Sequence, residues 1–194
     1  MLLTRKDNKR DLILSLGMKY CFEKDHAMKV EKAAVTIFDY LKGIYGLEER
    51  ERTLLSHAAL LHDIGDFISK KKHHKHSKYI IDTEESLDIY NEKDRMLLSL
   101  IAFNHRKKLH QCTMLLAKPD KDTVIKMSSI LRVADAVDFD RGNTEIRGIR
   151  QTGNKIILEV EGEGYLGTAS RLYTKSKLFR DTFGLEVEIE NLHY

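Results

Sequence analysis

Up to about residue 139, apolar residues recur along the chain at the three-to-four-residue spacing of helices that bury one face. This spacing predicts helices over about 6–20, 26–41, 48–64, 77–82, 92–104 and 123–139. Asp25 is the expected N-cap of the second of these helices, and Gly43 and Gly46 are expected to end it. Gly65 is the expected C-cap of the third helix.

Beyond residue 143 the pattern becomes an alternation of polar and apolar residues. Segments 145–150, 156–161 and 185–190 alternate as half-buried strands do, and 168–183 has helical spacing. The break between the two patterns is the polar stretch 140–143. We therefore expect a mainly α fold, with a helical bundle over 1–142 and a small α/β appendage over 143–194. The appendage carries no catalytic signature, and we interpret it as a packing or homodimerisation element.

Composition excludes several classes of protein. The chain has 194 residues, of which 42% are hydrophobic and 32% charged, as in ordinary globular proteins. A net charge of +3 is too small to indicate nucleic-acid binding. The polar start, residues 1–10, does not resemble a secretory signal, and no apolar run has membrane-spanning length. Cys21 and Cys112 have no paired spacing and suit free thiols. We expect a cytoplasmic protein that does not bind membranes.

Candidate chemistry resides in His26, the adjacent His62 and Asp63, and Asp135, all in apolar helical settings. Asp135 lies within the apolar segment Ile130–Val137. Burying its carboxylate there without a polar partner would be strongly unfavourable in free energy. Imidazole and carboxylate ligands together suit a divalent metal, and iron, manganese, zinc and magnesium are all compatible with the mixture. Such an ion activates water and polarises a phosphoryl oxygen, as phosphoester hydrolysis requires. The alternative is a buried network of ion pairs and hydrogen bonds.

This ordered set resembles the H…HD…D signature of the HD phosphohydrolase superfamily, whose members are helical and metal-dependent. Longer stretches resemble the C-terminal region of the exopolyphosphatase and guanosine pentaphosphatase family: Ala58–Ile68, His73–Ser77, Asn104–Lys107, Leu131–Asp138 and Ser176–Gly184. The resemblance covers nearly the whole chain. It implies an HD-domain helical bundle that binds a metal through His26, His62, Asp63 and Asp135.

In that family the phosphatase chemistry is assigned to an N-terminal actin-like half, which this chain lacks. Hydrolysis of polyphosphate or guanosine pentaphosphate is therefore not carried over. We expect a metal-dependent phosphohydrolase that cleaves a small phosphoester or nucleotide with a metal-activated water. One alternative is a non-catalytic module that binds polyphosphate or a guanosine nucleotide, and another is a subunit that docks on a separate actin-like phosphatase.

A second ion is expected as well. In HD proteins with two metals, histidines between the HD pair and the final aspartate hold the second ion. His76 and His105 occupy positions of that kind, with His74 in reserve. His73 and His76, three residues apart, would share one face of a helix. In this hypothesis Asp63 bridges the two ions and acts in catalysis.

Charged residues near these ligands complete the predicted site. Asp66 stands where many two-metal HD enzymes have a lysine, and we assign it as a proton acceptor or an outer-shell carboxylate. Arg106, Lys107 and Lys75 flank the ligands in sequence and would hold substrate phosphate oxygens. The alternative for the lysine-rich stretch is a solvated loop. Asp138 meets solvent or an arginine, or else it orients a ligand.

Overall fold

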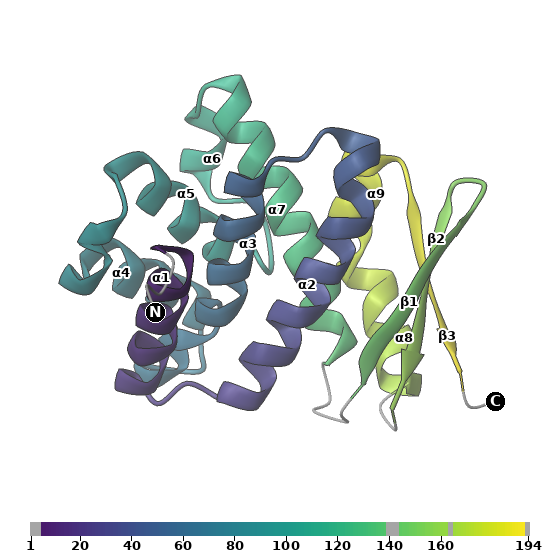
Figure 1. Ribbon diagram of the computed structural model, residues 1–194, viewed down its shortest axis with the longest axis horizontal. Coiled ribbons are helices and arrows are strands. Elements are labelled where there is room, and N and C mark those ends of the chain that lie inside the picture. The colour runs from purple at the N-terminus through teal and green to yellow at the C-terminus, as the bar shows by residue number, and fades with distance from the viewer. Residues whose placement is uncertain (1–4, 139–143, 163–164, 193–194) are drawn as a thin grey trace.

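The computed structural model describes residues 5–138, 144–162 and 165–192, without the side chains of 5–8, 165 and 166. Helices form the N-terminal part, and three strands with two further helices form the C-terminal part (Figure 1). The elements are α1 (Arg5–Lys19), α2 (Lys24–Tyr45), α3 (Glu49–Leu61), η1 (Ile64–Phe67), α4 (His73–Thr83), η2 (Glu85–Ile89), α5 (Glu92–Phe103), α6 (Gln111–Leu115), α7 (Lys118–Val137), β1 (Glu145–Thr152), β2 (Lys155–Glu161), α8 (Tyr165–Lys175), α9 (Lys177–Phe183) and β3 (Glu186–Asn191). The predicted mainly α fold with a small α/β appendage is confirmed.

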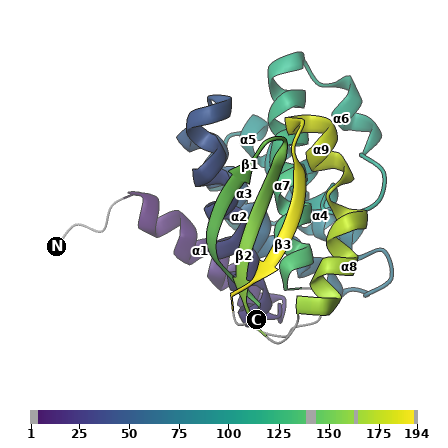
Figure 2. The ribbon, with the colours of Figure 1, turned by 90° about the vertical axis from the view of Figure 1, so that its right-hand side faces the viewer.

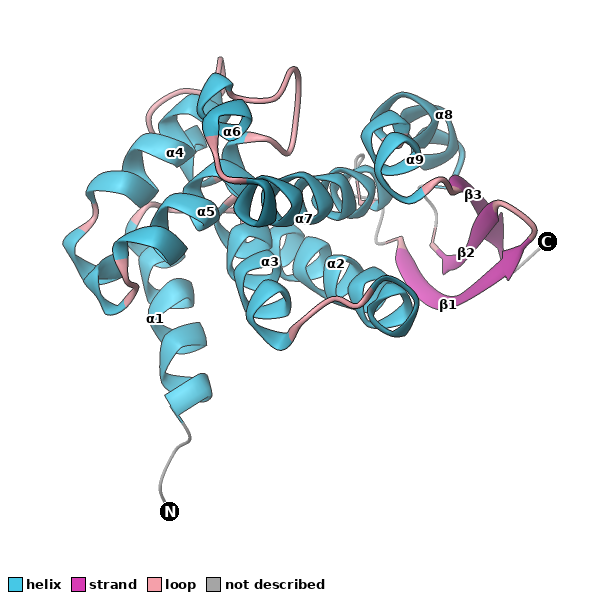
Figure 3. Cartoon of the chain, turned by 90° about the horizontal axis from the view of Figure 1, so that it is seen from above, coloured by secondary structure: helices cyan, strands magenta, loops and turns pink. Residues whose placement is uncertain are grey.

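Helix α7 lies at the centre of the molecule. It packs against α2, α3 and α5 on one side and against α8 and α9 on the other (Figure 3). Val124, Met127, Ile130 and Ala134 of α7 are fully buried, as expected for a helix covered on several faces. Asp135 therefore starts from a helix that is covered on several faces, which is why its carboxylate needs polar partners.

The C-terminal strands form one sheet in the order β1-β2-β3. Strands β1 and β2 form an antiparallel hairpin, whereas β2 and β3 are parallel and are joined by α8 and α9. Parallel neighbours need such a crossover connection. The two helices lie between the sheet and α7 (Figure 2). The appendage thus places α8 directly against the helix that carries Asp135.

Several predicted helix ends are wrong by a few residues. Glu23, not Asp25, is the N-cap of α2. Helix α7 begins at Lys118, before the predicted start, because Pro119 in its first turn needs no hydrogen-bonded N–H. The predicted helix over 168–183 is divided at Ser176 into α8 and α9. The expected end at Phe139, the break at 140–143 and the boundary between 142 and 143 lie outside the described residues, so the domain division stays a prediction.

Within residues 5–138, 144–162 and 165–192, every helix is too short or too polar to cross a bilayer.

Gly65 is not the C-cap of α3, because α3 ends at Leu61 and Gly65 lies in η1. A Cβ atom at Gly65 would stand 2.3 Å from the backbone oxygen of His73 and 2.4 Å from the backbone nitrogen of Ser77. The Ser77 hydroxyl donates to the carbonyl of His62 at 2.7 Å and accepts from the amide of Gly65 at 3.0 Å. Helix α4 is therefore fixed against the turn that carries His62 and Asp63, and only glycine permits this approach.

Substitution Gly65→Ala is expected to destabilise the protein by roughly 3 kcal/mol, because backbone atoms of α4 cannot move aside as a flexible side chain can. Urea denaturation measures the free energy of unfolding. Gly43→Ala is the matched control, since a Cβ at this exposed position inside α2 meets no atom within 4 Å. The control is expected to stabilise by about 0.5–1 kcal/mol. Equal stability of the two variants would contradict the close packing at Gly65.

Candidate metal centre

Six side chains from separate parts of the chain converge beside α7. Histidines and aspartates form two groups whose ligand atoms lie within 4.8 Å of one another in each group. The first group is His26, His62 and Asp135, and the second is Asp63, His73 and His105. Helices α2, α4 and α7 and the segments that follow α3 and α5 supply these side chains. The fold therefore brings together residues that lie up to about half the chain length apart in the sequence.

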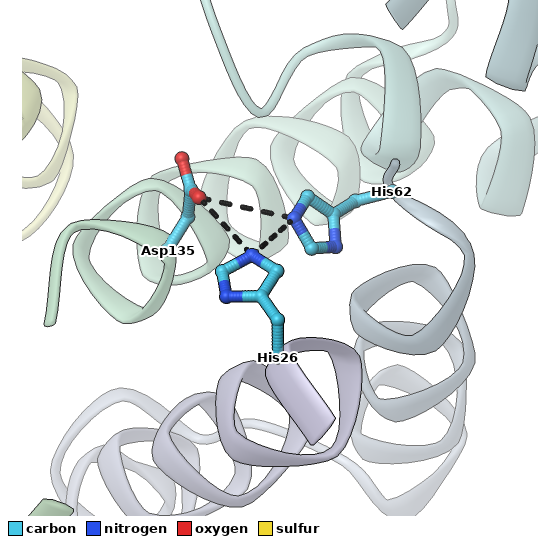
Figure 4. Close-up of side chains that lie close together, drawn as sticks. All are labelled: His26, His62 and Asp135. Carbon is cyan, nitrogen blue, oxygen red and sulfur yellow. Dashed lines mark hydrogen bonds and ion pairs between the residues drawn. The ribbon is translucent and has the colours of Figure 1, made fainter. Parts of the chain in front are cut away.

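The first group is compact enough for a single ion. The Nε2 atoms of His26 and His62 are 3.3 Å apart, and each lies 3.8 Å from Oδ1 of Asp135 (Figure 4). Ligands about 2.1 Å from a shared ion lie roughly 3–4 Å from one another. All three atoms point into the same space from three different elements (Figure 4). The separation and the atom types both suit a cation.

The second group has the same character. Nε2 of His73 lies 3.0 Å from Oδ1 of Asp63 and 3.1 Å from Nε2 of His105. Nε2 of His105 is 3.6 Å from the same Asp63 oxygen. His105 thus stands where a second-ion ligand was predicted, and its neighbour in the group is His73.

Asp63 stands between the two groups. Its Oδ2 lies 3.3 Å from Nε2 of His62 and 3.9 Å from Nε2 of His26, whereas its Oδ1 faces His73 and His105. A carboxylate whose two oxygens face separate sets of ligands can bridge two ions. This arrangement agrees with the bridging position predicted for Asp63.

The other ring nitrogen of His62 and of His105 is held by the backbone. Nδ1 of His62 donates to the carbonyl of Ala59 at 2.7 Å, and Nδ1 of His105 donates to the carbonyl of Ala102 at 2.6 Å. Both histidines follow the end of a helix, where the last carbonyls lack helical partners. Each bond keeps a proton on Nδ1 and so directs Nε2 to the shared space, as metal-ligating histidines require.

A carboxylate holds His26 and a backbone carbonyl holds His73. Nδ1 of His26 donates to Oδ2 of Asp138 at 2.9 Å. Asp138 is 2% exposed, so of the roles considered for it the structure favours orienting a ligand over contact with solvent. Nδ1 of His73 lies 3.0 Å from Oδ1 of Asp66 and 3.2 Å from the carbonyl of Lys70. Asp66 lies beside His73, but its Oδ1 makes no hydrogen bond, so the carbonyl of Lys70 is the partner that holds Nδ1 of His73.

Charges in the centre compensate one another. Lys175 of α8 donates to Oδ2 of Asp135 at 2.7 Å. Burial alone raises the pKa of Asp135, but Lys175 and His62 lower it to about 2. Burial alone lowers the pKa of His62, but Asp63 and Asp135 raise it to about 9. The aspartates are therefore ionised, and cationic neighbours balance them. A divalent cation would supply the same balance and would displace the proton from His62.

A cavity of about 280 Å³ opens onto these ligands. Four cationic side chains line it: Lys70, Arg106, Arg171 and Lys175. The guanidinium of Arg106 donates to Nε2 of His73 at 3.1 Å, so this predicted phosphate-binding residue lies at the second group. Lys107 lines a neighbouring cavity. Lys75 is exposed on α4 and is not among the described residues that line either cavity, so the phosphate contact proposed for it stays a prediction.

His76 requires a correction, because His73 takes the place predicted for it. His76 is half-buried and belongs to neither group of ligands among the described residues. Helix α4 begins at His73, several residues before the predicted start, so the first turn of α4 faces Asp63. His74, the predicted reserve, packs its ring against Phe103 with centroids 4.9 Å apart. The sequence does not indicate which of these histidines faces the other candidate ligands, because that depends on where α4 begins and how it packs.

Comparisons with known proteins find relatives of this chain. The family model described as Ppx/GppA phosphatase, domain III, matches residues 9–176, which include all six side chains of the two groups. The guanosine-5'-triphosphate,3'-diphosphate pyrophosphatase of Aeromonas hydrophila subsp. hydrophila is 36% identical over 123 residues, which are 62% of this chain and 24% of that protein. The Aeromonas salmonicida protein of the same name is 33% identical over 133 residues, which are 66% of this chain and 26% of the relative. The chain thus spans about a quarter of the length of these relatives.

Proposed function

This chain belongs to the family of Ppx/GppA phosphatase domain III, and we propose that it is a metal-dependent phosphohydrolase acting on a small phosphoester or nucleotide. The observation that carries the proposal is the pair of ligand groups joined by Asp63. All four histidine Nε2 atoms converge there, each with its Nδ1 beside an acceptor. A buried network of hydrogen bonds alone would not need so many lone pairs to face one another.

The residues present fit one or two divalent cations. His26, His62 and Asp135 would hold the first ion, His73 and His105 would hold the second, and Asp63 would contact both. The imidazoles of this set suit iron or zinc, and its carboxylates suit manganese or magnesium. When bound, the ions would polarise a phosphoryl oxygen and lower the pKa of a coordinated water, which makes hydrolysis feasible at neutral pH.

The chain's own residues would position the substrate. Arg106 and Lys70 line the cavity next to the second group and would hold phosphate oxygens by charge-assisted hydrogen bonds. Asp138 is a positioning residue, because it would act on the metal through its hydrogen bond with His26. Proton uptake is the role proposed for Asp66, which also lines the cavity.

A binding module without catalysis is the competing proposal. The cationic wall of the cavity supports it, and the relatives named as pyrophosphatases are about four times longer than the matched region. Such a module would bind polyphosphate or a guanosine nucleotide and release no phosphate.

Elemental analysis of protein purified without chelator, together with phosphate release from a panel of phosphoesters and nucleotides, tests the proposal. We expect close to two equivalents of metal per chain and hydrolysis that EDTA abolishes and manganese or iron restores. Tight, salt-sensitive nucleotide binding without phosphate release, with either metal supplied, would instead identify a binding module. Protein that takes up no metal would reject the metal centre itself.

A further inference from the structure

Lys175 enters the first ligand group from the appendage. Its side chain is 14% exposed, and its Nζ donates at 2.7 Å to Oδ2 of Asp135, whose side chain is 15% exposed. Burial of a lysine removes water from its charge and freedom from its long side chain, so the lysine requires a compensating partner. Here that partner is a candidate metal ligand. The appendage thus contributes a side chain to the candidate site, which its interpretation as a packing or homodimerisation element did not foresee.

Helix α8 fixes the position of Lys175. Lys175 is the last residue of α8, and Leu172, three residues earlier on the same face, lies in the hydrophobic core. The Thr168 hydroxyl donates to the carbonyl of Val137 at 2.9 Å and joins α8 to the end of α7, which carries Asp135. The lysine therefore reaches Asp135 because two packed helices present it there.

The two oxygens of Asp135 have different partners. Oδ1 lies 3.8 Å from Nε2 of both His26 and His62 (Figure 4), whereas Oδ2 accepts the hydrogen bond from Lys175. A carboxylate can bind a cation through one oxygen or through both. Because Lys175 holds Oδ2, Asp135 would offer the first ion Oδ1 alone. A ligand restricted in this way leaves a coordination position of the ion for water or substrate.

The charge of Lys175 acts in opposite directions on the two states of the first group. In the metal-free protein it attracts the carboxylate of Asp135 and offsets the cost of burying it. When an ion binds, the ammonium group and the ion share one carboxylate, and two cations so close repel each other where little water screens them. Metal affinity depends on the difference between the two states. Lys175 therefore stabilises the metal-free protein and weakens the binding of the ion.

We propose that Lys175 is a positioning residue that restricts Asp135 to one ligand oxygen and keeps the first divalent ion exchangeable. This inference rests on the proposed function, because it needs the metal centre, and it adds a control of metal affinity to it. The appendage sets that affinity through α8, and the chain stays folded when the ion leaves.

Lys175→Met tests this role, because methionine retains much of the apolar stem of the side chain but carries no charge. Competition with a fluorescent chelator measures the overall association constant for manganese, taken over all bound ions, which is expected to rise at least about tenfold. A lysine that served only in packing would give weaker binding when replaced. The melting temperature of the metal-free variant is expected to fall, and manganese is expected to raise it by more than in the unmodified protein.

Lys177→Met is the matched control, since Lys177 is exposed on α9 and pairs with Asp181 instead of a metal ligand. Its manganese affinity is expected to stay within about threefold of that of the unmodified protein. Lys175→Arg keeps the positive charge and is expected to stay within the same range. If metal-free Lys175→Met does not fold, the rate of manganese release from protein produced with the metal is measured instead, and release is expected to be at least about tenfold slower.

Manganese affinity that is unchanged or weaker in Lys175→Met, or release at an unchanged rate, overturns the role of Lys175. An equal gain of affinity in Lys177→Met or Lys175→Arg overturns it as well. Tighter binding in Lys175→Met without any phosphate release supports this role and rejects the proposed catalysis. Unmodified protein that takes up no metal rejects the metal centre itself.

Discussion

Asp63→Asn is expected to remove both bound ions and to lower kcat/KM by at least about 10³-fold, which corresponds to roughly 4 kcal/mol of transition-state stabilisation. Asp63 has carboxylate oxygens 3.3 Å from His62 and 3.0 Å from His73, so it contacts both ligand groups. The amide keeps the shape of the side chain but loses its negative charge, and it presents an NH2 group to one set of histidine nitrogens. Metal content per chain and kcat/KM measure the two effects.

Two further aspartates serve as controls for this substitution. Asp66→Asn is expected to weaken metal binding by no more than about 10-fold, because Asp66 lies beside His73 and belongs to neither ligand group. Asp82→Asn, at an aspartate of α4 that pairs with Lys78, is expected to change neither measurement. Circular dichroism establishes that each variant is folded. An Asp63→Asn protein with two equivalents of metal and full activity would exclude the bridging carboxylate.

Much of the candidate metal centre could be predicted because its polar and charged residues lie within or beside apolar helical segments of the sequence. Asp135 interrupts an apolar helical stretch, and the structure places that helix at the centre of the fold. His62 and Asp63 follow a helix whose last turn is apolar, so both side chains start from the interior. Polar groups in such positions need partners wherever the helices finally pack. This reasoning depends on local sequence alone, which is why these residues could be proposed as ligands from the sequence.

Other parts of the site depend on packing that local sequence does not record. Arg171 and Lys175 have the spacing of any solvated helix face, and only the position of α8 against α7 brings them to the ligands. Gly65 has the same appearance in sequence as a helix cap, but its role arises from the approach of α4. The β2–β3 pairing is also non-local, since two helices intervene. In each of these cases the role depends on a contact between different helices or strands, which the local sequence does not indicate.

The second large effect is expected from replacing the histidine of α4 that binds a metal ion, which we propose is His73 and not His76. His73→Ala is expected to remove one of two ions and to lower kcat/KM by at least about 100-fold, because its Nε2 lies 3.0 Å from Asp63 and 3.1 Å from His105. His76→Ala is the matched control on the same helix, and it is expected to keep both ions and to change kcat/KM by less than about threefold.

Metal content and single-turnover rates of the two variants separate three arrangements of the site. Loss of one ion in His73→Ala alone agrees with the ligand group in which Asp63 and His105 complete the shell. Loss in His76→Ala alone would mean that α4 shifts along its axis by nearly one turn when metal binds, since the two residues are three positions apart on one face of the helix. Retention of every bound ion in both variants would restrict the centre to His26, His62 and Asp135, with Asp63 as a terminal ligand of a single ion.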